Sequence, residues 1–298
     1  MTGAVATRAG TLRALLRAER MVTAPGAYDA ITARMIAQAG FPAVYMTGAG
    51  TAATLGYPDY GLVTMTEMVA NAGRIVRAVD VPVIADADTG YGNELNVIRT
   101  VQEHEQVGTS GIHIEDQVAP KKCGHLEDKQ IIPREEFVAK IRAAVAARRD
   151  PDFLVIARTD SRAVAGFDEA AARCNAALAA GADMAFFEAP QTLEEVAAVP
   201  KVVRGACLLN VVWGGKTPVV NLRDAEAMGY RLAIVPGLLM KSVLGICDAV
   251  LEELKTTQLH PVPVKNLTVQ QVFARMGSGD WDKYRTMFRD DGEKQAAE

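Results

Sequence analysis

The sequence is poor in aromatic residues and has no marked excess of charge of either sign. Only 6% of its 298 residues are aromatic, and the formal net charge is −4. Because basic and acidic residues are interspersed, we expect no basic face for a phosphate backbone and no nucleic-acid partner. The apolar 49% of the chain is mainly Ala, Val, Leu and Ile, which is typical of buried parallel strands with helices packed around them.

The four cysteines lie far apart and form no CxxC pair. This spacing argues against a zinc knuckle and a disulfide framework, and it favours a reducing, cytoplasmic location. Residues 1–20 have four arginines but no continuous apolar run, so we expect a leading helix and no secretory signal. The most hydrophobic stretch, residues 232–251, is interrupted by Pro236, Gly237, Lys241 and Asp248, so we expect no membrane span.

Glycine-rich nucleotide motifs are also missing. Neither GxGxxG nor GxxxxGK[ST] occurs, which counts against a doubly wound open sheet, the main structural alternative. Short apolar runs of strand length instead alternate with segments of helical length, at 21–24, 43–46, 83–85, 111–114, 154–157, 184–187, 207–211 and 232–235. Eight repeats of this alternation predict an α/β fold, the (β/α)8 TIM barrel.

Helices are predicted between these runs at 66–79, 93–107, 134–148 and 167–180. Periodicity is lost in residues 255–265, which contain two prolines. We therefore predict a barrel catalytic domain at 1–255 and a C-terminal helical extension at 256–298, with helices at 268–276 and 280–288. Such an extension usually packs on a neighbouring subunit, so we also predict a homo-oligomer.

Polar side chains follow most predicted strands, at the end of a barrel where active sites lie. They occupy residues 47–50, 86–88, 115–116, 158–160, 188 and 210. Asp86 and Asp88 can reach one side of their strand end, and Glu115 from the neighbouring strand completes an oxygen-rich pocket. Without a cation these carboxylates would repel one another. Oxygen ligands without nearby His or Cys favour Mg²⁺, with Mn²⁺ as a substitute, over Zn²⁺.

A polar loop containing Lys121-Lys122-Cys123-Gly124-His125 follows the fourth strand. Its basic neighbours should favour the Cys123 thiolate, which would make this cysteine a proton donor and acceptor near neutral pH. The alternative is a surface loop with an incidental cysteine.

The same five residues match the KKCGH signature of the isocitrate lyase family, within the superfamily that includes phosphoenolpyruvate mutase. The resemblance covers most of residues 20–250, through GAYD at 26–29, YMTG at 45–48, GYPD at 56–59, DADTGYG at 86–92, GIHIEDQ at 111–117, ARTD at 157–160 and EAP at 188–190. It implies a Mg²⁺-dependent carbon–carbon lyase on a TIM barrel, acting on a small carboxylic acid and assembled as a homotetramer.

The resemblance also assigns roles to individual residues. It implies that Asp86 is the direct metal ligand, and that metal-bound waters are held by Asp59, Asp88 and Glu115. It implies that the keto-acid carboxylate is bound by Thr47, Gly48 and Ala49.

Five residues would be catalytic by the same resemblance: Tyr45, Cys123, His125, Arg158 and Glu188. Tyr45 would lie beside the oxygen that gains or loses a proton, and Arg158 would anchor the substrate and neutralise enolate charge. Cys123 would protonate the leaving carbanion when its loop closes. The other substrate carboxylate would be lined by Gly124, His125, Glu188 and Asn210.

These roles predict retro-aldol cleavage of a 2,3-dimethylmalate-like or methylisocitrate-like acid to an α-keto acid and a carboxylate. The alternatives are an oxaloacetate hydrolase and a mutase-type phosphonate enzyme, although the mutases replace the KKCGH loop. A Schiff-base aldolase is disfavoured because no lysine ends a predicted strand. A catalytically dead binding protein would be expected to have lost Asp86, Cys123 or Arg158.

The segment after Asn210 bears on the substrate. In methylisocitrate and isocitrate lyases hydroxyl residues here bind a further carboxylate, whereas this chain has Val211, Val212 and Trp213. The segment is similar to the GGKTP type of relatives that cleave 2,3-dimethylmalate or hydrolyse oxaloacetate. Burying a carboxylate against two valines and an indole would cost several kcal/mol, so we predict a methyl-bearing 2-hydroxy dicarboxylate in preference to a tricarboxylate.

Overall fold

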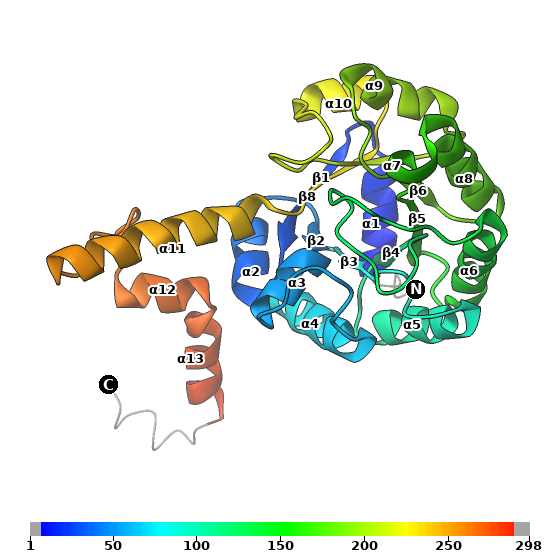
Figure 1. The fold of residues 1–298 in the computed structure, drawn as a ribbon. Helices are drawn as coiled ribbons and strands as arrows, with labels where there is room; N and C mark the ends of the chain where they lie inside the picture. The colour runs from blue at the N-terminus through cyan, green and yellow to red at the C-terminus, as the bar shows by residue number, and fades with distance from the viewer. Residues whose placement is uncertain (1–6, 289–298) are drawn as a thin grey trace. The chain divides into compact units, whose positions relative to one another are not determined.

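The computed structural model describes residues 7–288, in which eight parallel strands close into a barrel (Figure 1). Each strand pairs with the next, and β8 pairs with β1 to complete the ring. The strands are β1 Val22–Ala27, β2 Val44–Met46, β3 Val83–Asp86, β4 Gly111–Glu115, β5 Leu154–Thr159, β6 Met184–Phe187, β7 Cys207–Asn210 and β8 Leu232–Val235. Each coincides with a predicted run, so the predicted fold is confirmed.

Helices precede β1 and connect the later strands. They are α1 Arg8–Arg17, α2 Ala30–Gln38, α3 Gly48–Thr54, α4 Met65–Ala78, α5 Glu94–Gln106, α6 Arg134–Ala147, α7 Arg162–Ala165, α8 Phe167–Ala179, α9 Leu193–Val202 and α10 Leu222–Met228. Their starts follow from local chemistry: Thr64 and Glu67 form a reciprocal capping box at α4, and Asp29 caps α2. The predicted leading helix corresponds to α1, and the four predicted connecting helices correspond to α4, α5, α6 and α8.

The interior of the barrel is filled by side chains. One buried cluster joins residues of seven strands, all except β4, and it includes Tyr45, Ile84, Ile156, Phe186 and Leu232. Alternate residues of the same strands point outward and pack against the surrounding helices. The barrel is therefore a packed core, which holds the strand ends, and the polar residues after them, in fixed positions.

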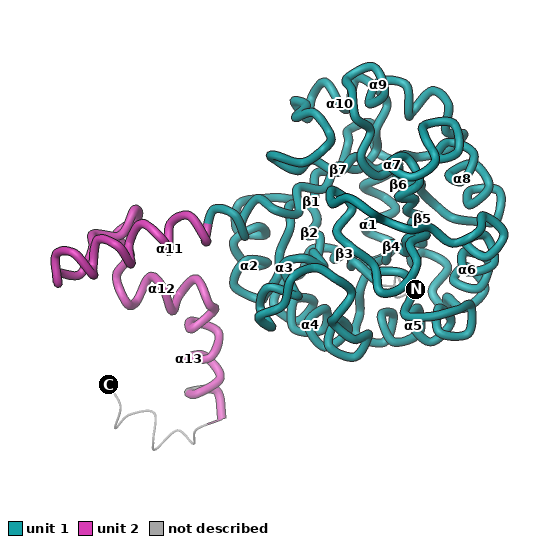
Figure 2. The backbone as a smooth tube through the Cα atoms, viewed as in Figure 1, with its two compact units in different colours: residues 1–242 teal, residues 243–298 magenta. Residues whose placement is uncertain are grey.

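The structure divides into two compact units, Met1–Ser242 and Val243–Glu298 (Figure 2). The boundary falls within α11 Leu238–Thr257, before residue 255, where we predicted the barrel domain to end. The second unit also contains α12 Val269–Arg275 and α13 Ser278–Met287, close to the two predicted helices. No described residue of α11 is buried. Between residues 7 and 288, no helix has the length and apolar character needed to cross a membrane.

Candidate active site

A cavity of about 240 Å³ opens at the carboxyl end of the barrel strands. Its walls come from strand ends and the loops that follow them. Eleven residues predicted for the site line it, namely Tyr45, Thr47, Ala49, Asp59, Asp86, Cys123, Gly124, His125, Arg158, Glu188 and Asn210. The remaining three, Gly48, Asp88 and Glu115, contact members of this lining. The structure therefore brings every predicted site residue to one mouth of the barrel.

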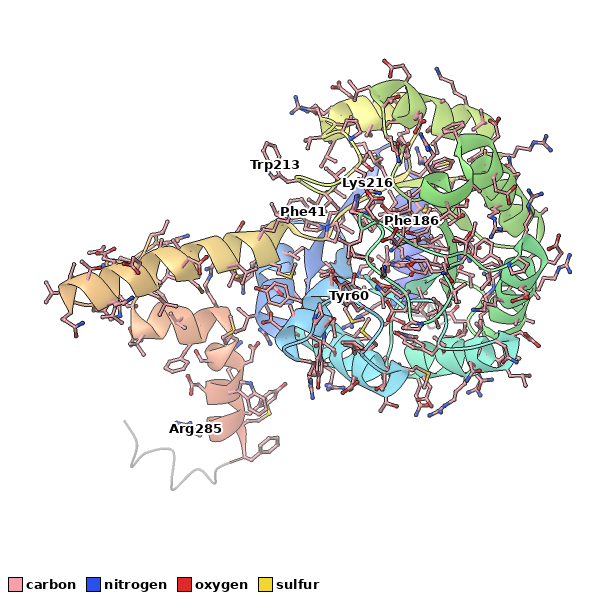
Figure 3. All side chains as sticks on the ribbon, viewed as in Figure 1. Phe41, Tyr60, Phe186, Trp213, Lys216 and Arg285 are labelled. Atoms are coloured by element: carbon pink, nitrogen blue, oxygen red, sulfur yellow. The ribbon has the colours of Figure 1, made fainter. Side chains whose placement is uncertain are left out.

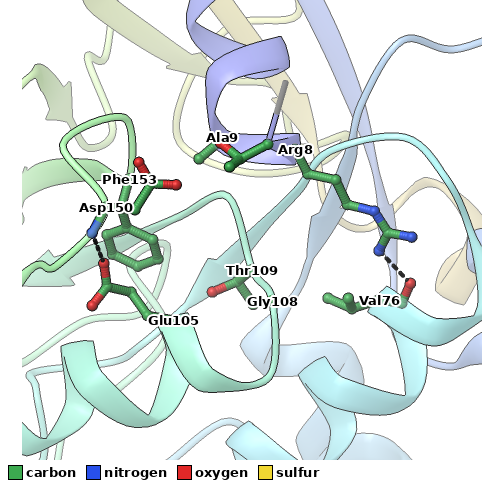
Figure 4. Close-up of a pocket in the computed structure, with 9 residues that line it drawn as sticks. Arg8, Ala9, Val76, Glu105, Gly108, Thr109, Asp150 and Phe153 are labelled. Atoms are coloured by element: carbon green, nitrogen blue, oxygen red, sulfur yellow. Dashed lines mark hydrogen bonds between the residues drawn. The ribbon is translucent and has the colours of Figure 1, made fainter. Parts of the chain in front are cut away.

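A second cavity, of about 340 Å³, lies at the opposite end of the strands (Figure 4). Its lining includes Thr109 and Phe153, which precede β4 and β5. Its charged groups bind the main chain: Arg8 donates to the carbonyl of Val76 over 2.6 Å, and Glu105 accepts from the N–H of Asp150 over 3.0 Å. Because residues at this end of a barrel serve stability rather than chemistry, we place the active site at the carboxyl end.

Asp86, the last residue of β3, is held by main-chain donors. Its carboxylate accepts hydrogen bonds from the N–H groups of Gly48 at 3.1 Å and Asp88 at 2.9 Å. A Cβ on Gly48 would lie 2.5 Å from Asp86 Oδ2, so glycine is required for this approach. Burial opposes ionisation of Asp86, but the charges of Lys121 and Arg158 and the hydrogen bond from the Asp88 N–H lower its pKa. Asp86 is therefore a fixed, ionised carboxylate at the centre of the site.

Tyr45 connects Asp86 to a buried histidine that sequence reasoning missed. The Tyr45 hydroxyl lies 2.8 Å from Nε2 of His113 and 3.4 Å from Oδ2 of Asp86, so its single proton can be donated to only one of them at a time. Burial raises the pKa of Tyr45 and lowers that of His113 to about 4. At neutral pH both groups are therefore uncharged, so the ionisation of Asp86 depends on Lys121 and Arg158. In the tautomer that carries its proton on Nδ1, His113 can accept the phenolic proton at Nε2.

Lys121 neutralises two of the predicted metal-site carboxylates. Its Nζ lies 2.5 Å from Asp59 Oδ1 and 2.9 Å from Asp88 Oδ1, and its side chain is only 3% exposed. Burial raises the pKa of Asp88 to about 6 despite the nearby ammonium, and burial raises the pKa of Glu115 well above its ordinary value. The cluster thus holds more carboxylates than nearby cations neutralise.

The predicted metal site fits a hydrated ion rather than a fully protein-coordinated one. Among the residues described, no three His, Cys, Asp or Glu side chains are grouped closely enough to hold a metal directly. Both carboxyl oxygens of Glu115 are nevertheless buried without a hydrogen bond. Mg²⁺ commonly binds through one or two carboxylates and keeps several waters. Asp86 as ligand, with Asp59, Asp88 and Glu115 bound through water, fits that pattern and remains a prediction.

Arg158, from β5, is held rigidly by carboxylates. It makes two hydrogen bonds to Asp160, at 2.9 and 3.2 Å, and lies 3.2 Å from Glu115 and 3.6 Å from Glu188. Its guanidinium also stacks over Phe186, 5.0 Å from the ring centroid. These contacts fix a buried positive charge at the wall of the cavity.

Asp160 is fixed in turn by residues outside the cavity. Its main-chain N–H donates to Asp116 over 2.8 Å, and its carboxylate accepts from Lys129 over 2.8 Å. Lys129 also donates to the carbonyl of Gly124. The loop that carries Cys123 and Gly124 is thereby tied to the same carboxylate that orients Arg158.

The loop carrying Cys123 is closed against the barrel mouth in this structure. The Cys123 N–H donates to the carbonyl of Asp59 over 3.1 Å, and Gln117 binds the main chain of Lys122 through both ends of its amide. A Cβ on Gly124 would lie 2.5 Å from Arg158 Nη2. Only glycine therefore allows the loop to come this close to the guanidinium.

The expectation that the Cys123 thiolate is favoured is wrong for this conformation. Burial raises the pKa of the thiol, and the charge of Asp59 raises it further. The nearby ammonium of Lys121 is already paired with Asp59 and Asp88. A thiol that keeps its proton at neutral pH is suited to donate that proton rather than to remove one.

Glu188, at the end of β6, is surrounded by donors. Nε2 of His125 lies 3.2 Å from its Oε1, and the amide of Asn210 donates to its Oε2 over 3.1 Å. Burial lowers the pKa of His125. The predicted residues Gly124, His125, Glu188 and Asn210 thus form one wall of the cavity.

The segment after β7 only partly matches the substrate prediction. Trp213 is 75% exposed and points away from the cavity (Figure 3), and Val211 packs instead against a neighbouring core cluster. The premise that a further carboxylate would be buried against two valines and an indole therefore does not hold for Val211 and Trp213. Val212 does line the cavity, with Pro236, Met240 and the charged Lys241, so apolar side chains remain at this end beside one cation.

Four residues that contact the predicted site residues were not predicted, because no pattern in the sequence indicates which side chains pair in the fold. His113, Lys121, Lys129 and Asp160 all contact predicted residues. Lys121 stands in the quoted signature and Asp160 at a predicted strand end, so their positions were visible although their partners were not.

The chain is similar to known proteins along most of its length. A family model described as phosphoenolpyruvate phosphomutase matches residues 12–255. A 2,3-dimethylmalate lyase of Eubacterium barkeri is 52% identical over 229 residues, covering 76% of this chain and 79% of the relative. A 2-methylisocitrate lyase of Aeropyrum pernix is 41% identical over 274 residues, covering 91% and 88%.

Solved structures of the same superfamily are also similar to this chain along most of its length. Oxaloacetate acetylhydrolase, bound to the inhibitor 3,3-difluorooxalacetate, superposes with a TM-score of 0.90 at 35% identity, covering 93% of this chain and 96% of the other. Phosphonopyruvate hydrolase, solved with oxalate and Mg²⁺, gives a TM-score of 0.85 at 30% identity, covering 94% and 99%. The chain belongs to the phosphoenolpyruvate mutase/isocitrate lyase superfamily and is one of its carbon–carbon lyases.

Proposed function

We propose that this lyase cleaves a methyl-bearing 2-hydroxy dicarboxylate, such as 2,3-dimethylmalate, to pyruvate and a monocarboxylate. The observation that carries the proposal is the cavity in which Tyr45, Asp86 and Arg158 share a wall with a protonated Cys123. A retro-aldol cleavage needs an acceptor for the hydroxyl proton, stabilisation of negative charge and a proton donor for the departing carbon. The cavity supplies one of each.

The proposal includes Mg²⁺ as cofactor, with Mn²⁺ as a substitute. The oxygen-only cluster of Asp59, Asp86, Asp88 and Glu115 supports it, as does the Mg²⁺ in the structurally similar phosphonopyruvate hydrolase. When bound, Mg²⁺ would polarise the oxygens of the keto-acid half and stabilise the charge that develops there.

The protein's own residues divide the remaining work. Tyr45 receives the proton of the substrate hydroxyl as it passes its own proton to the neutral His113. The bond between the hydroxyl-bearing carbon and its neighbour breaks, and its electron pair stays on the neighbour. Arg158 neutralises the carboxylate-stabilised carbanion, and Cys123 delivers the proton that converts it to the free monocarboxylate. Closure of the loop excludes water from the carbanion.

The apolar end of the cavity supports the choice of substrate. Val212, Pro236 and Met240 offer no hydrogen bond from their side chains, and the ammonium of Lys241, which also lines the cavity, already donates to the carbonyl of Trp213. An additional carboxylate placed against the three apolar side chains would lose hydration. A methyl group would gain about 0.8 kcal/mol per buried carbon. The 52% identity to a 2,3-dimethylmalate lyase favours the same acid.

One comparison tests the proposal: kcat/KM with Mg²⁺ for 2,3-dimethylmalate, 2-methylisocitrate, isocitrate, oxaloacetate and phosphonopyruvate. We expect 2,3-dimethylmalate to be preferred by at least tenfold. The structural likeness to oxaloacetate acetylhydrolase makes oxaloacetate hydrolysis the second candidate. A tenfold preference for either tricarboxylate, for oxaloacetate or for the phosphonate would reject the first choice.

We further propose that the active form is a cytoplasmic homotetramer. The cysteine pattern supports the location, and all four cysteines are free. Within the second unit, Leu251, Phe273 and Trp281 are each more than half exposed, which favours burial against another copy of the chain.

A further inference from the structure

The segment after β7 touches the catalytic loop at His125. The main-chain N–H of Lys216 donates to His125 Nδ1 over 3.0 Å, and the Lys216 ammonium lies 2.8 Å from Glu127 in the same loop. A Cβ on Gly215 would lie 2.7 Å from His125 Nδ1 and 2.9 Å from Cε1. Glycine is therefore required for the main chain to approach the imidazole this closely.

This contact determines which nitrogen of His125 carries the proton. Because Nδ1 accepts a hydrogen bond from an N–H group, the proton of the neutral ring must be on Nε2. Nε2 lies 3.2 Å from Glu188 Oε1, so the ring donates to this carboxylate. The amide nitrogen of Asn210 lies farther from Nε2, at 3.5 Å, and donates to Glu188 over 3.1 Å. The opposite tautomer would set two donors against each other at Lys216 and two acceptors against each other at Glu188.

Glu188 in turn depends on that donor. It is buried, and its carboxylate is otherwise in contact with Asn210 at 3.1 Å and Arg158 at 3.6 Å. Burying a carboxylate without such hydrogen-bond donors is costly in free energy. The Nε2–H tautomer of His125 therefore links the loop that carries Cys123 to the hydrogen bonding of Glu188, and through Glu188 to the position of Arg158.

We propose that Gly215 and Lys216 are positioning residues that, through their main chain, select the Nε2–H tautomer of His125 and so hold the closed loop against Glu188. This inference rests on the proposed function, because it concerns the closed state of the same site. It gives the GGK sequence after β7 a role in loop closure, in addition to its place beside the substrate. A substitution that disturbs the main chain at Gly215 or Lys216 should therefore lower activity even though the side chains that line the cavity are unchanged.

The experiment uses the full chain labelled with ¹⁵N-histidine and long-range ¹H–¹⁵N spectra of the imidazole rings. The sequence has only four histidines, so loss of one ring system in His125→Gln assigns the signal. Lys216→Pro removes the N–H donor, whereas Lys216→Ala keeps it and removes only the ion pair to Glu127. Gly215→Ala keeps the N–H donor of Lys216 but places a Cβ where it would clash with the His125 ring.

In the wild type we expect His125 as the Nε2–H tautomer. Lys216→Pro and Gly215→Ala should change its ring signals and lower kcat/KM by about tenfold, the size expected for one lost positioned hydrogen bond. Lys216→Ala should leave the ring signals unchanged and keep kcat/KM within about twofold, because an ion pair to the exposed Glu127 contributes little.

An Nδ1–H tautomer in the wild type would overturn the inference, and so would unchanged His125 signals in both folded main-chain variants. If neither variant folds, the wild-type tautomer alone decides the matter. The ring spectra need no substrate, so their outcome is separable from failure of the proposed activity. Activity towards an unexpected acid would reject the proposed function and leave the tautomer result standing.

Discussion

His104, in α5, is buried with no hydrogen-bond partner for either ring nitrogen among the residues described. Burial lowers its pKa from 6.5 to about 4. Between these values the unfolded chain binds a proton that the folded chain does not. Stability is therefore unaffected by this group above pH 6.5, falls as the pH drops below 6.5, and reaches its full loss below about pH 4.

The size of the loss follows from the two pKa values. A gap from 6.5 to about 4 corresponds to about 3.4 kcal/mol when complete, and about 2 kcal/mol of it is lost by pH 5. His104→Leu removes the titrating group and replaces two unpaired buried nitrogens with apolar atoms. We therefore expect the variant to lose about 2 kcal/mol less than wild type between pH 7.5 and pH 5.

The assay is urea denaturation at both pH values, at constant protein concentration because assembly also affects stability. His260→Gln is the control for loss of a histidine, since His260 is exposed. Between pH 7.5 and pH 5, the free energy of unfolding of His260→Gln should fall by as much as that of the wild type. If His104→Leu also loses as much stability as wild type, the buried neutral imidazole is not responsible for acid sensitivity and the reasoning is refuted.

Three further outcomes are expected. Chelation should abolish turnover, Mg²⁺ or Mn²⁺ should restore it, and Asp86→Asn should be folded yet inactive; full activity in excess chelator would contradict the metal assignment. Cys123→Ser should lower kcat by roughly 10²–10⁴-fold with little change in Tm, as for loss of a positioned proton donor, and a variant within twofold of wild type would make the cysteine incidental. Phe273→Asp with Trp281→Asp should reduce the assembled mass measured by light scattering, whereas an unchanged mass would show that this unit does not mediate assembly.

The barrel could be predicted from the sequence because its signal is local. Each strand is a short apolar run, and a polar residue such as Asp86 or Arg158 marks where it ends. A parallel barrel brings all carboxyl ends of its strands to one mouth, so position along the chain was enough to place these side chains together. Helix α3 was not predicted, because its seven residues are too short to show periodicity.

Protonation and pairing could not be predicted because they depend on burial and on distant partners. The sequence shows Cys123 between basic residues, but in the fold Lys121 pairs with Asp59 and Asp88 while burial governs the thiol. The direction of Trp213 was equally hidden, since it depends on the path of the main chain after β7. The charges of neighbours in the sequence therefore do not predict the protonation state of a side chain that is buried in the fold.

The site has a floor and a rim of different character. The floor, including Asp160 and Arg158, is cross-linked by hydrogen bonds to the strands, so a substitution there disturbs several buried charges together. The rim at Val212, Pro236 and Met240 is apolar and makes no such side-chain hydrogen bonds. Evolution could therefore exchange rim residues one at a time, altering which acid is accepted, while the inherited chemistry of bond cleavage stays intact.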